Sequence, residues 1–445
     1  MVMIEMEKIS MAKVCLFLML FSVSGFAQEV DVETKWANGQ VQEQGKTVDT
    51  LKQGDWQTFY DDGTKFCIGE YTDDERSGRW QCHYRSGQMM SDINYGDGKV
   101  LGYFGDGATE REGQHEAGKK TGVWKEFFKT GKLKSEINYK EGDRDGAAKE
   151  YHADGKPSVE GNYSAGKKNG GFKWFYPDGT VEMEGEFVED ERSGHWKFNY
   201  KNGTLGSEGE FSKGKINGEW KYYYEEEGTV WKIGNYSNDL KQGEWQRFFE
   251  DGPKFNEGAF DQNMETGLWT SYFHSGQIKE QGTFEKGKMH GNWKGFFENG
   301  SPKFVSDFKA GTRHGFYHLW FENGKKQMEK NYKDGLEDGA TMVWHENGKL
   351  KEEGNFSEGN KNGNWKHFYA DGKPFQNIGY RNGRQEGLYE GWYETGVKWY
   401  SSTYLNGKLA GVSTNYDEAG KISFKARYKA GKLVKVLFKG DGIGK

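Results

Sequence analysis

One pattern dominates this sequence: a glycine that opens a short aromatic-rich run recurs every 24 residues. The copy at Gly194 reads GHWKFNYKNGTLGSEGEFSKGKIN. With each such glycine as position 0, units begin at Gly54, Gly78, Gly102, Gly122, Gly146, Gly170, Gly194, Gly218, Gly243, Gly267, Gly291, Gly315, Gly339, Gly363, Gly387 and Gly411. The step is 24 except for one of 20 after Gly102 and one of 25 after Gly218. Such a repeat predicts one supersecondary unit copied along the chain.

Each unit has the pattern of a β-hairpin. Positions 1 to 7 are rich in aromatic residues, positions 8 and 9 are typically Asn-Gly or Asp-Gly, and positions 10 to 18 alternate. Asn-Gly between two such runs is the strongest short-range hairpin signal. We therefore expect an all-β fold, an elongated single-sheet solenoid of about sixteen hairpin repeats with a right-handed twist. At the usual strand spacing it would be on the order of 150 Å long.

A turn centred on positions 8 and 9 predicts the register of the hairpin. Position 2 then faces position 15, position 4 faces 13, and position 6 faces 11. Position 2 is often Trp and position 15 is often Gly. In the unit at Gly194, Trp196 is expected to cover Gly209 on the adjacent strand, with Phe211 on the same face. We interpret these three residues as structural members of a repeating core.

The first 27 residues differ from the repeats. Lys8 and Lys13 precede the apolar run VCLFLMLFSV, and Ala27 precedes Gln28. This order predicts a signal peptide over residues 1–27, because ten apolar residues are too few to span a bilayer. We expect cleavage near Ala27/Gln28 and export to the periplasm, to the outer membrane surface or to the medium, with no transmembrane segment in the mature chain.

The remaining chain divides by its match to the repeat. Residues 28–53 are expected to form an N-terminal cap or degenerate repeat, residues 54–411 the hairpin repeats, and residues 412–445 the final repeat and a C-terminal cap. Aromatic residues make up 16% of the sequence, which is too many for a disordered chain.

Charge and motifs exclude several classes of function. The 62 Lys and Arg and 68 Asp and Glu give a net charge of -6 without a basic patch, which argues against nucleic acid as a partner. No catalytic or metal-ligating motif is present, so no enzyme activity, cofactor or metal site is expected.

Two cysteines remain after residue 27. Cys67 lies at position 13 of one unit and Cys82 at position 4 of the next, both on the predicted core face. An oxidising compartment favours a disulfide between them. Two buried thiols that only fill space are the other interpretation, and the sequence leaves both open.

The opposite face carries the candidate binding residues. Position 5 is aromatic in thirteen units and position 3 is Lys in seven. The predicted binding strip comprises the rings of Phe127, Phe175, Tyr223, Phe248, Tyr272, Phe296, Trp320, Trp344, Phe368 and Trp392, with Lys125, Lys149, Lys173, Lys197, Lys221, Lys294 and Lys366. Repeat proteins often bind along one long face. A second packing stripe covered by lysine stems is the alternative interpretation.

The segments GEWKYYYEEEG and GNWKGFFENG, the latter preceded by KGKMHG, carry a family resemblance over roughly residues 54 to 431. The chain resembles MORN repeats, and most closely the bacterial MORN-variant repeats of YwqK-type antitoxin components of toxin–antitoxin modules. The resemblance implies a twisted rod of hairpins used for protein or membrane-lipid association, without catalysis by the repeats.

These observations lead to one main functional expectation and two alternatives. The main expectation is an exported, non-enzymatic scaffold that binds a protein partner or another component of the cell envelope. The first alternative is binding of a glycan or an anionic lipid along the strip. The second is an antitoxin, which requires residence in the cytoplasm, whereas the N-terminal segment predicts export.

Overall fold

The computed structural model describes residues 28–440; the predicted signal peptide and residues 441–445 lie outside them. The described residues form 35 β-strands and no helix. The predicted all-β fold of repeated hairpins is therefore confirmed. The chain divides into two compact units, one up to Gly155 and one from Lys156 onward, and each is described by itself.

The first unit is an antiparallel sheet in which each strand pairs with the next along the chain. Its strands are β1 (Glu29–Lys35), β2 (Val41–Val48), β3 (Leu51–Phe59), β4 (Lys65–Thr72), β5 (Glu75–His83), β6 (Met89–Asn94), β7 (Lys99–Tyr103), β8 (Thr109–Glu116), β9 (Lys119–Phe127), β10 (Leu133–Lys140) and β11 (Asp143–Tyr151).

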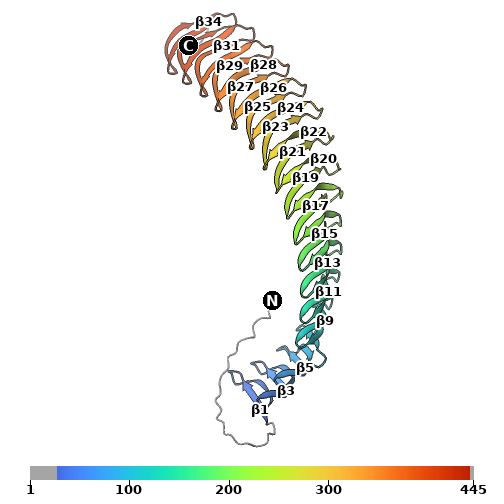
Figure 1. Cartoon of the computed structure of the whole chain (residues 1–445). Coiled ribbons are helices and arrows are strands. Elements are labelled where there is room, and N and C mark those ends of the chain that lie inside the picture. Colours follow the sequence, from blue (N-terminus) through green and yellow to red (C-terminus); the bar gives the residue numbers. More distant parts are fainter. Residues whose placement is uncertain (1–27, 441–445) are drawn as a thin grey trace. The chain divides into compact units, whose positions relative to one another are not determined.

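The second unit repeats the same antiparallel order, and Figure 1 shows its strands following one another from green to red. They are β12 (Pro157–Ser164), β13 (Lys167–Phe175), β14 (Val181–Val188), β15 (Glu191–Asn199), β16 (Leu205–Ser212), β17 (Lys215–Tyr223), β18 (Val230–Ser237), β19 (Leu240–Phe248), β20 (Lys254–Asp261), β21 (Met264–Tyr272), β22 (Ile278–Glu285), β23 (Lys288–Phe296), β24 (Pro302–Lys309), β25 (Thr312–Trp320), β26 (Lys326–Lys333), β27 (Leu336–Trp344), β28 (Leu350–Ser357), β29 (Asn360–Phe368), β30 (Pro374–Arg381), β31 (Arg384–Trp392), β32 (Lys398–Leu405), β33 (Lys408–Tyr416), β34 (Ile422–Lys429) and β35 (Lys432–Lys439).

The hairpin register follows the prediction until it reaches the turn. Trp196 pairs with Gly209, but position 5 rather than position 6 faces position 11, because a bulge precedes Asn199. At the turn, the N–H of Gly203 donates to the carbonyl of Tyr200 at 2.9 Å, and Gly203 has a φ of 87°. The turn with Gly203 in the left-handed region thus takes three residues, one more than a two-residue turn, and the register shift before Asn199 leaves Gly206 of β16 without a partner in the pairing. The predicted pairing of positions 6 and 11 is therefore wrong.

The tryptophan at position 2 covers a different glycine from the one predicted. The Trp196 ring lies over Gly185 of β14, where an added Cβ would be 2.2 Å from the ring, and Gly209 lies under Trp220. The indole Nε1–H of Trp196 donates to the carbonyl of Glu186 at 3.1 Å, which fixes the ring toward the preceding strand. The same arrangement joins Gly45 and Trp56, Gly69 and Trp80, Gly113 and Trp124, Gly161 and Phe172, Gly234 and Trp245, Gly258 and Trp269, Gly282 and Trp293, and Gly354 and Trp365.

These rings form the core of a sheet that has no second layer within the described residues. Phe211, as predicted, lies on the Trp196 face, and their ring centroids are 5.8 Å apart in an edge-to-face contact. Phe187 makes the same contact on the other side at 5.1 Å. The guanidinium of Arg192 lies 4.7 Å from the Trp196 ring centroid and covers it. Neighbouring rings and a cation thus bury Trp196 completely, in place of an opposing layer.

The short step in the repeat lies one unit earlier than the sequence suggests. Gly98 has the positive φ of the other position 0 glycines, at 72°, whereas Gly102 does not. Val100 is buried and pairs with Gly113, so it takes the place of the position 2 tryptophan. The four missing residues therefore belong to the return turn after Tyr95, and the unit begins at Gly98 rather than Gly102.

Candidate binding strip

The ten aromatic rings of the predicted strip are all half-buried, one on each of ten odd-numbered strands. Each ring lies where the register shifts and is directly opposite position 11 of its own hairpin, as Phe248 is opposite Lys254 and Phe296 opposite Pro302. The exception is Tyr223 in the 25-residue unit, which is opposite Val230 at position 12. Asn199 takes the position 5 place on β15 and donates to the carbonyl of Val181 at 3.0 Å. The row of rings is therefore interrupted between β13 and β17.

Apart from Lys294, the lysines of the strip lie beside glutamates at position 14 rather than beside the rings. Lys173 Nζ is 2.8 Å from a Glu184 carboxylate oxygen, and Lys366 Nζ is 2.7 Å from one of Glu353. The hydrogen bond to Glu184 raises the pKa of Lys173. Opposite charges directly across two strands stabilise a sheet modestly. The strip consequently presents charges of both signs and not a row of cations.

Two tyrosines of the strip bind the same row of glutamates. The hydroxyl of Tyr223 donates to Glu208 at 2.6 Å, and that of Tyr272 donates to Glu257 at 2.5 Å. Burial, together with the hydrogen bond to Glu257, raises the pKa of Tyr272 to about 12. The bond from Tyr223 lowers the pKa of Glu208. Positions 3, 5 and 14 therefore share one face.

The cations that do lie near strip rings come from position 11, which the sequence reasoning missed. The distance from the lysine Nζ atom to the ring centroid is 5.9 Å for Lys254 and Tyr272, 5.7 Å for Lys326 and Trp344, and 5.7 Å for Lys398 and Trp392. Aligning position 11 across the units would have shown these lysines. The shift arises from the bulge, which moves position 11 beside position 5.

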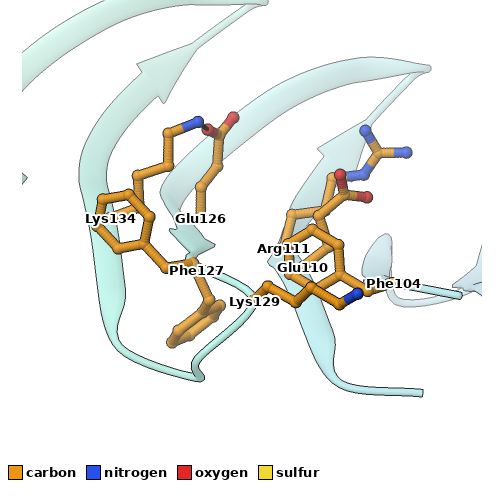
Figure 2. A pocket seen from close by; sticks show the side chains of 8 residues that line it. Phe104, Glu110, Arg111, Glu126, Phe127, Lys129 and Lys134 are labelled. Carbon is orange, nitrogen blue, oxygen red and sulfur yellow. Dashed lines mark hydrogen bonds and ion pairs between the residues drawn. The ribbon is translucent and has the colours of Figure 1, made fainter. Parts of the chain in front are cut away.

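The first ring of the strip lines a shallow hollow in the first unit, which Figure 2 shows from close by. Its volume is about 380 Å³. It is lined by Phe104, Glu110, Arg111, Glu126, Phe127, Phe128, Lys129 and Lys134. Lys134 Nζ donates to Glu126 at 3.4 Å on its rim. Three cations, two carboxylates and three rings give this hollow the same mixed chemistry as the rest of the strip.

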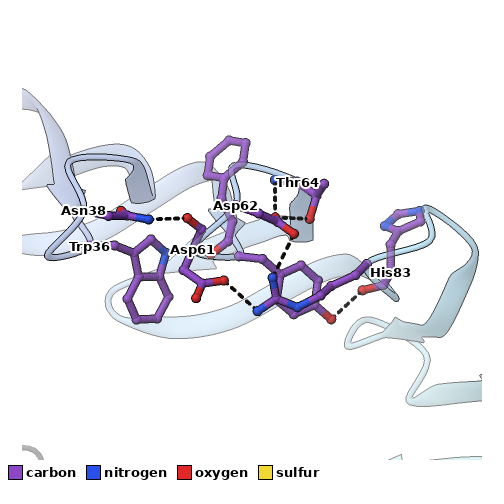
Figure 3. Close-up of polar contacts among 9 residues, drawn as sticks. Trp36, Asn38, Asp61, Asp62, Thr64 and His83 are labelled. Carbon is purple, nitrogen blue, oxygen red and sulfur yellow. Dashed lines mark hydrogen bonds and ion pairs between the residues drawn. The ribbon is translucent and has the colours of Figure 1, made fainter.

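A second row of contacts, at the hairpin turns, joins many of the repeats to the next. Where position 6 is Tyr or Trp, its side chain can donate to the carbonyl of position 5 in the following unit, as Tyr60 does to His83 at 3.0 Å and Trp36 to Phe59 at 3.1 Å. Figure 3 shows this row at its N-terminal start. The same bond is made by Tyr84, Tyr176, Tyr200, Tyr224, Tyr369 and Tyr393. The recurrence of Tyr at position 6 was visible in the sequence.

The turn carboxylates in Figure 3 are held by their neighbours. Arg85 bridges Asp61 and Asp62 of the preceding turn at 2.7 and 2.8 Å. Thr64 donates its hydroxyl to Asp62 at 2.6 Å. That bond, with the backbone N–H of Thr64 and the guanidinium of Arg85, lowers the pKa of Asp62 to about 2. These groups fix the turns and leave no open catalytic pair.

Cys67 and Cys82 form a disulfide in the structure. They are directly opposite each other on β4 and β5. Both are buried on the core face beside Trp56 and Trp80. The bond therefore joins two consecutive hairpins and is part of the core of the first unit.

Residues 28–440 contain no group of three His, Cys, Asp or Glu side chains placed to hold a metal ion. Nor does this part of the chain include a helix long and apolar enough to cross a bilayer.

Seven segments of the chain match the family model described as the MORN repeat variant. They are residues 120–141, 144–165, 168–189, 265–286, 289–310, 337–358 and 361–382. Each MORN-variant match covers a hairpin turn with the strands on either side of it. The resemblance to MORN repeats is thus supported for these seven repeats. The match identifies a type of repeat and names no activity.

Comparison with solved structures gives only distant likenesses. The crystal structure of TcdB2-TccC3-Cdc42 is 9% identical over 94% of this chain and 29% of that one, with a TM-score of 0.14. The Tc holotoxin pore of Photorhabdus luminescens is 9% identical over 90% and 26%, also at 0.14. The chain spans less than a third of each. No curated protein matches this chain.

Proposed function

We propose that this protein is an exported, non-enzymatic scaffold that binds a protein partner along the strip. MORN-variant repeats and a sheet of repeated hairpins fit a protein-interaction scaffold. The observation that carries the proposal is the row of half-buried rings on one face, among them Phe248, Tyr272 and Phe296 on three consecutive odd-numbered strands.

The charges beside the rings favour a protein surface over a polyanion. Lys173 and Lys366 are each within 3 Å of a glutamate oxygen. An anionic lipid or polyanion would meet these glutamates as well as the lysines, which weakens its attraction. A protein surface that carries both signs of charge can satisfy both rows. Aromatic rings among such charges are the groups that most often dominate the energy of protein interfaces.

A pull-down from an envelope fraction tests the strip. We expect the wild-type chain to recover a specific protein, and the combined change Phe248→Ala, Tyr272→Ala and Phe296→Ala to abolish its recovery. The matched control is Val188→Ala, Leu240→Ala and Leu336→Ala, which removes exposed apolar side chains away from the strip. Circular dichroism checks that both variants fold. Equal recovery by the strip variant and the wild type would refute the strip as the binding surface.

Export is tested by the mass of the N-terminus. We expect the mature chain to begin at Gln28 and to fractionate with the envelope or the medium. A full-length, unprocessed chain in the cytosol would contradict export and would favour the antitoxin alternative.

A glycan is the second candidate ligand, and the tyrosine–glutamate pairs are the observation that favours it. The hydroxyl of Tyr272 is bonded to Glu257, next to half-exposed rings. Aromatic rings can stack on the apolar face of a sugar ring, and carboxylates can accept hydrogen bonds from its hydroxyl groups. Retention on cell-wall polysaccharide that persists in high salt and is lost in the Phe248, Tyr272 and Phe296 variant would support this ligand. Absence of retention at low salt would exclude it.

A further inference from the structure

The outer strand β35 presents an unpaired sheet edge. Within the described residues it pairs only with β34, and all eight of its residues are exposed. Its exposed apolar side chains are Leu433, Val434, Val436, Leu437 and Phe438. An edge strand with free backbone N–H and C=O groups and exposed apolar side chains is a template for another strand.

The positive charge of this edge favours an acidic partner. Lys432 is directly opposite Lys429, and Lys435 is directly opposite Arg427. Like charges directly across two strands destabilise a sheet. The sequence from Ala419 to Gly440 contains seven Lys and Arg and no Asp or Glu. Lys432 and Lys435 therefore have no acidic residue within 419–440 to compensate their charge.

The first strand, β1, presents the complementary edge. Among residues 28–440 it pairs only with β2. Glu29, Asp31 and Glu33 alternate along it with Val30 and Val32, and all three acidic residues are exposed. The alternation places the carboxylates on one face of the strand and the valines on the other.

Local ion pairs leave part of this acidic charge available to a partner. Lys46 lies 3.2 Å from Glu29, and Lys35 lies 3.3 Å from Glu33, with all four side chains about half exposed. None of the ion pairs in the described part of the chain involves Asp31. Exposed pairs of this kind contribute little energy and exchange partners readily.

We propose that β35 of one copy of this chain pairs edge to edge with β1 of a second copy. The proposal concerns different residues from those of the strip and does not depend on the proposed function. Pairing β35 with β35 would place lysines against lysines, and pairing β1 with β1 would place carboxylates against carboxylates. Only the mixed pair sets opposite charges together and covers the apolar side chains of both strands. Such a contact is head-to-tail, so it continues from copy to copy unless the rotation between copies closes a ring.

Light scattering of the purified chain over a range of concentrations tests the pairing. We expect the mass of the wild type to grow beyond that of a dimer at low salt and to fall as NaCl is added, since salt screens exposed charges. The basic edge is reversed by Lys432→Glu, Lys435→Glu and Lys439→Glu, and the acidic edge by Glu29→Lys, Asp31→Lys and Glu33→Lys. Either set alone should weaken association at least about tenfold.

Mixing the two charge-reversal variants provides the decisive test. The reversed β35 of one variant is complementary to the reversed β1 of the other, and their two unchanged edges are complementary as well, so an equimolar mixture should regain the wild-type mass. A matched control, Lys215→Glu, Lys288→Glu and Lys408→Glu, makes the same change of charge on strands that are paired on both sides, and should leave association unchanged.

Several results would overturn the proposal. These are a wild type that stays monomeric at every concentration, growth that stops at a dimer, or a mixture that fails to associate. A monomeric chain whose binding to phosphatidylglycerol vesicles is lost with the β35 reversal would assign this edge to a lipid surface instead.

Discussion

At the scale of single residues, the fold depends on glycines that leave room for a ring from the next repeat. A Cβ at Gly185 would lie 2.2 Å from the Trp196 ring, which is far inside van der Waals contact. The ring cannot move away freely, because its N–H is bonded to the carbonyl of Glu186 and neighbouring rings pack against it. Glycine is therefore required at position 15 because a Cβ would clash with the ring, and not because of the backbone conformation.

The substitution Gly185→Ala should accordingly be costly. We expect a loss of about 2–3 kcal/mol in the free energy of unfolding, in the range measured for overpacked cores. Gly171 on the paired strand β13 is the control, because an added Cβ there meets nothing within 4 Å. Gly171→Ala should be neutral or slightly stabilising. Urea denaturation of the two variants makes the comparison, and equal effects would refute the role of the ring.

Asp62 should give the first turns a dependence on acid pH. Its folded pKa of about 2 lies below the ordinary value of about 3.9. The ionised form is therefore favoured in the folded state, so its stabilisation is complete above pH 4 and is lost as the pH falls toward 2. Thermal melts should show that Asp62→Asn is less stable than the wild type at pH 7 and equally stable at pH 2. A difference that does not change with pH would contradict this assignment.

At the scale of elements, the hairpins could be predicted and the details of their contacts could not. Asn-Gly turns and alternating runs indicated strands such as β15 and β16 because those signals are local. The direction of the Trp196 ring was predicted wrongly, since position 2 has a glycine on both adjacent strands and the sequence pattern does not distinguish them. In the structure the ring lies over Gly185, and its N–H donates to the carbonyls of Glu186 and Ser193. The bulge before Asn199 also escaped prediction, because a three-residue turn and a two-residue turn share the same Asn-Gly pair.

The row of position 6 hydroxyls should hold neighbouring hairpins together. Tyr200 donates to the carbonyl of Tyr223 at 3.0 Å, and Tyr200→Phe removes that bond while keeping the ring. We expect a loss of about 1 kcal/mol in the free energy of unfolding. Tyr428→Phe serves as control, since the hydroxyl of Tyr428 has no hydrogen bond within residues 28–440. Comparable losses in the two variants would argue against the row as a source of stability.

At the scale of the molecule, contacts between neighbouring repeats should make stability a local property. Within each unit, the strands pair with their neighbours in sequence, and such proteins gain stability repeat by repeat. The length of the repeat could be predicted because the same spacing recurs many times in the sequence. The position of the short unit could not, because both Gly98 and Gly102 are plausible starts and only the φ angle and the pairing of Val100 distinguish them.

Reduction of the Cys67–Cys82 bond tests this locality. A disulfide that closes a loop of about fifteen residues raises the free energy of unfolding by roughly 3 kcal/mol. We expect reduction to lower protection from hydrogen exchange in the repeats around β4 and β5 and to leave β20 to β30 unchanged, as read by mass spectrometry. The Cys67→Ser and Cys82→Ser double variant should show the same pattern without reductant. Uniform loss of protection along the chain would mean that the repeats unfold together.

The placement of each tryptophan over the preceding glycine also gives the chain an order of assembly during synthesis. Gly185 leaves the ribosome eleven residues before Trp196, the residue that covers it. A hairpin that has just emerged therefore still lacks one face of its packing, and the next strand supplies it. The core of each hairpin can therefore be completed only after the following strand has also emerged.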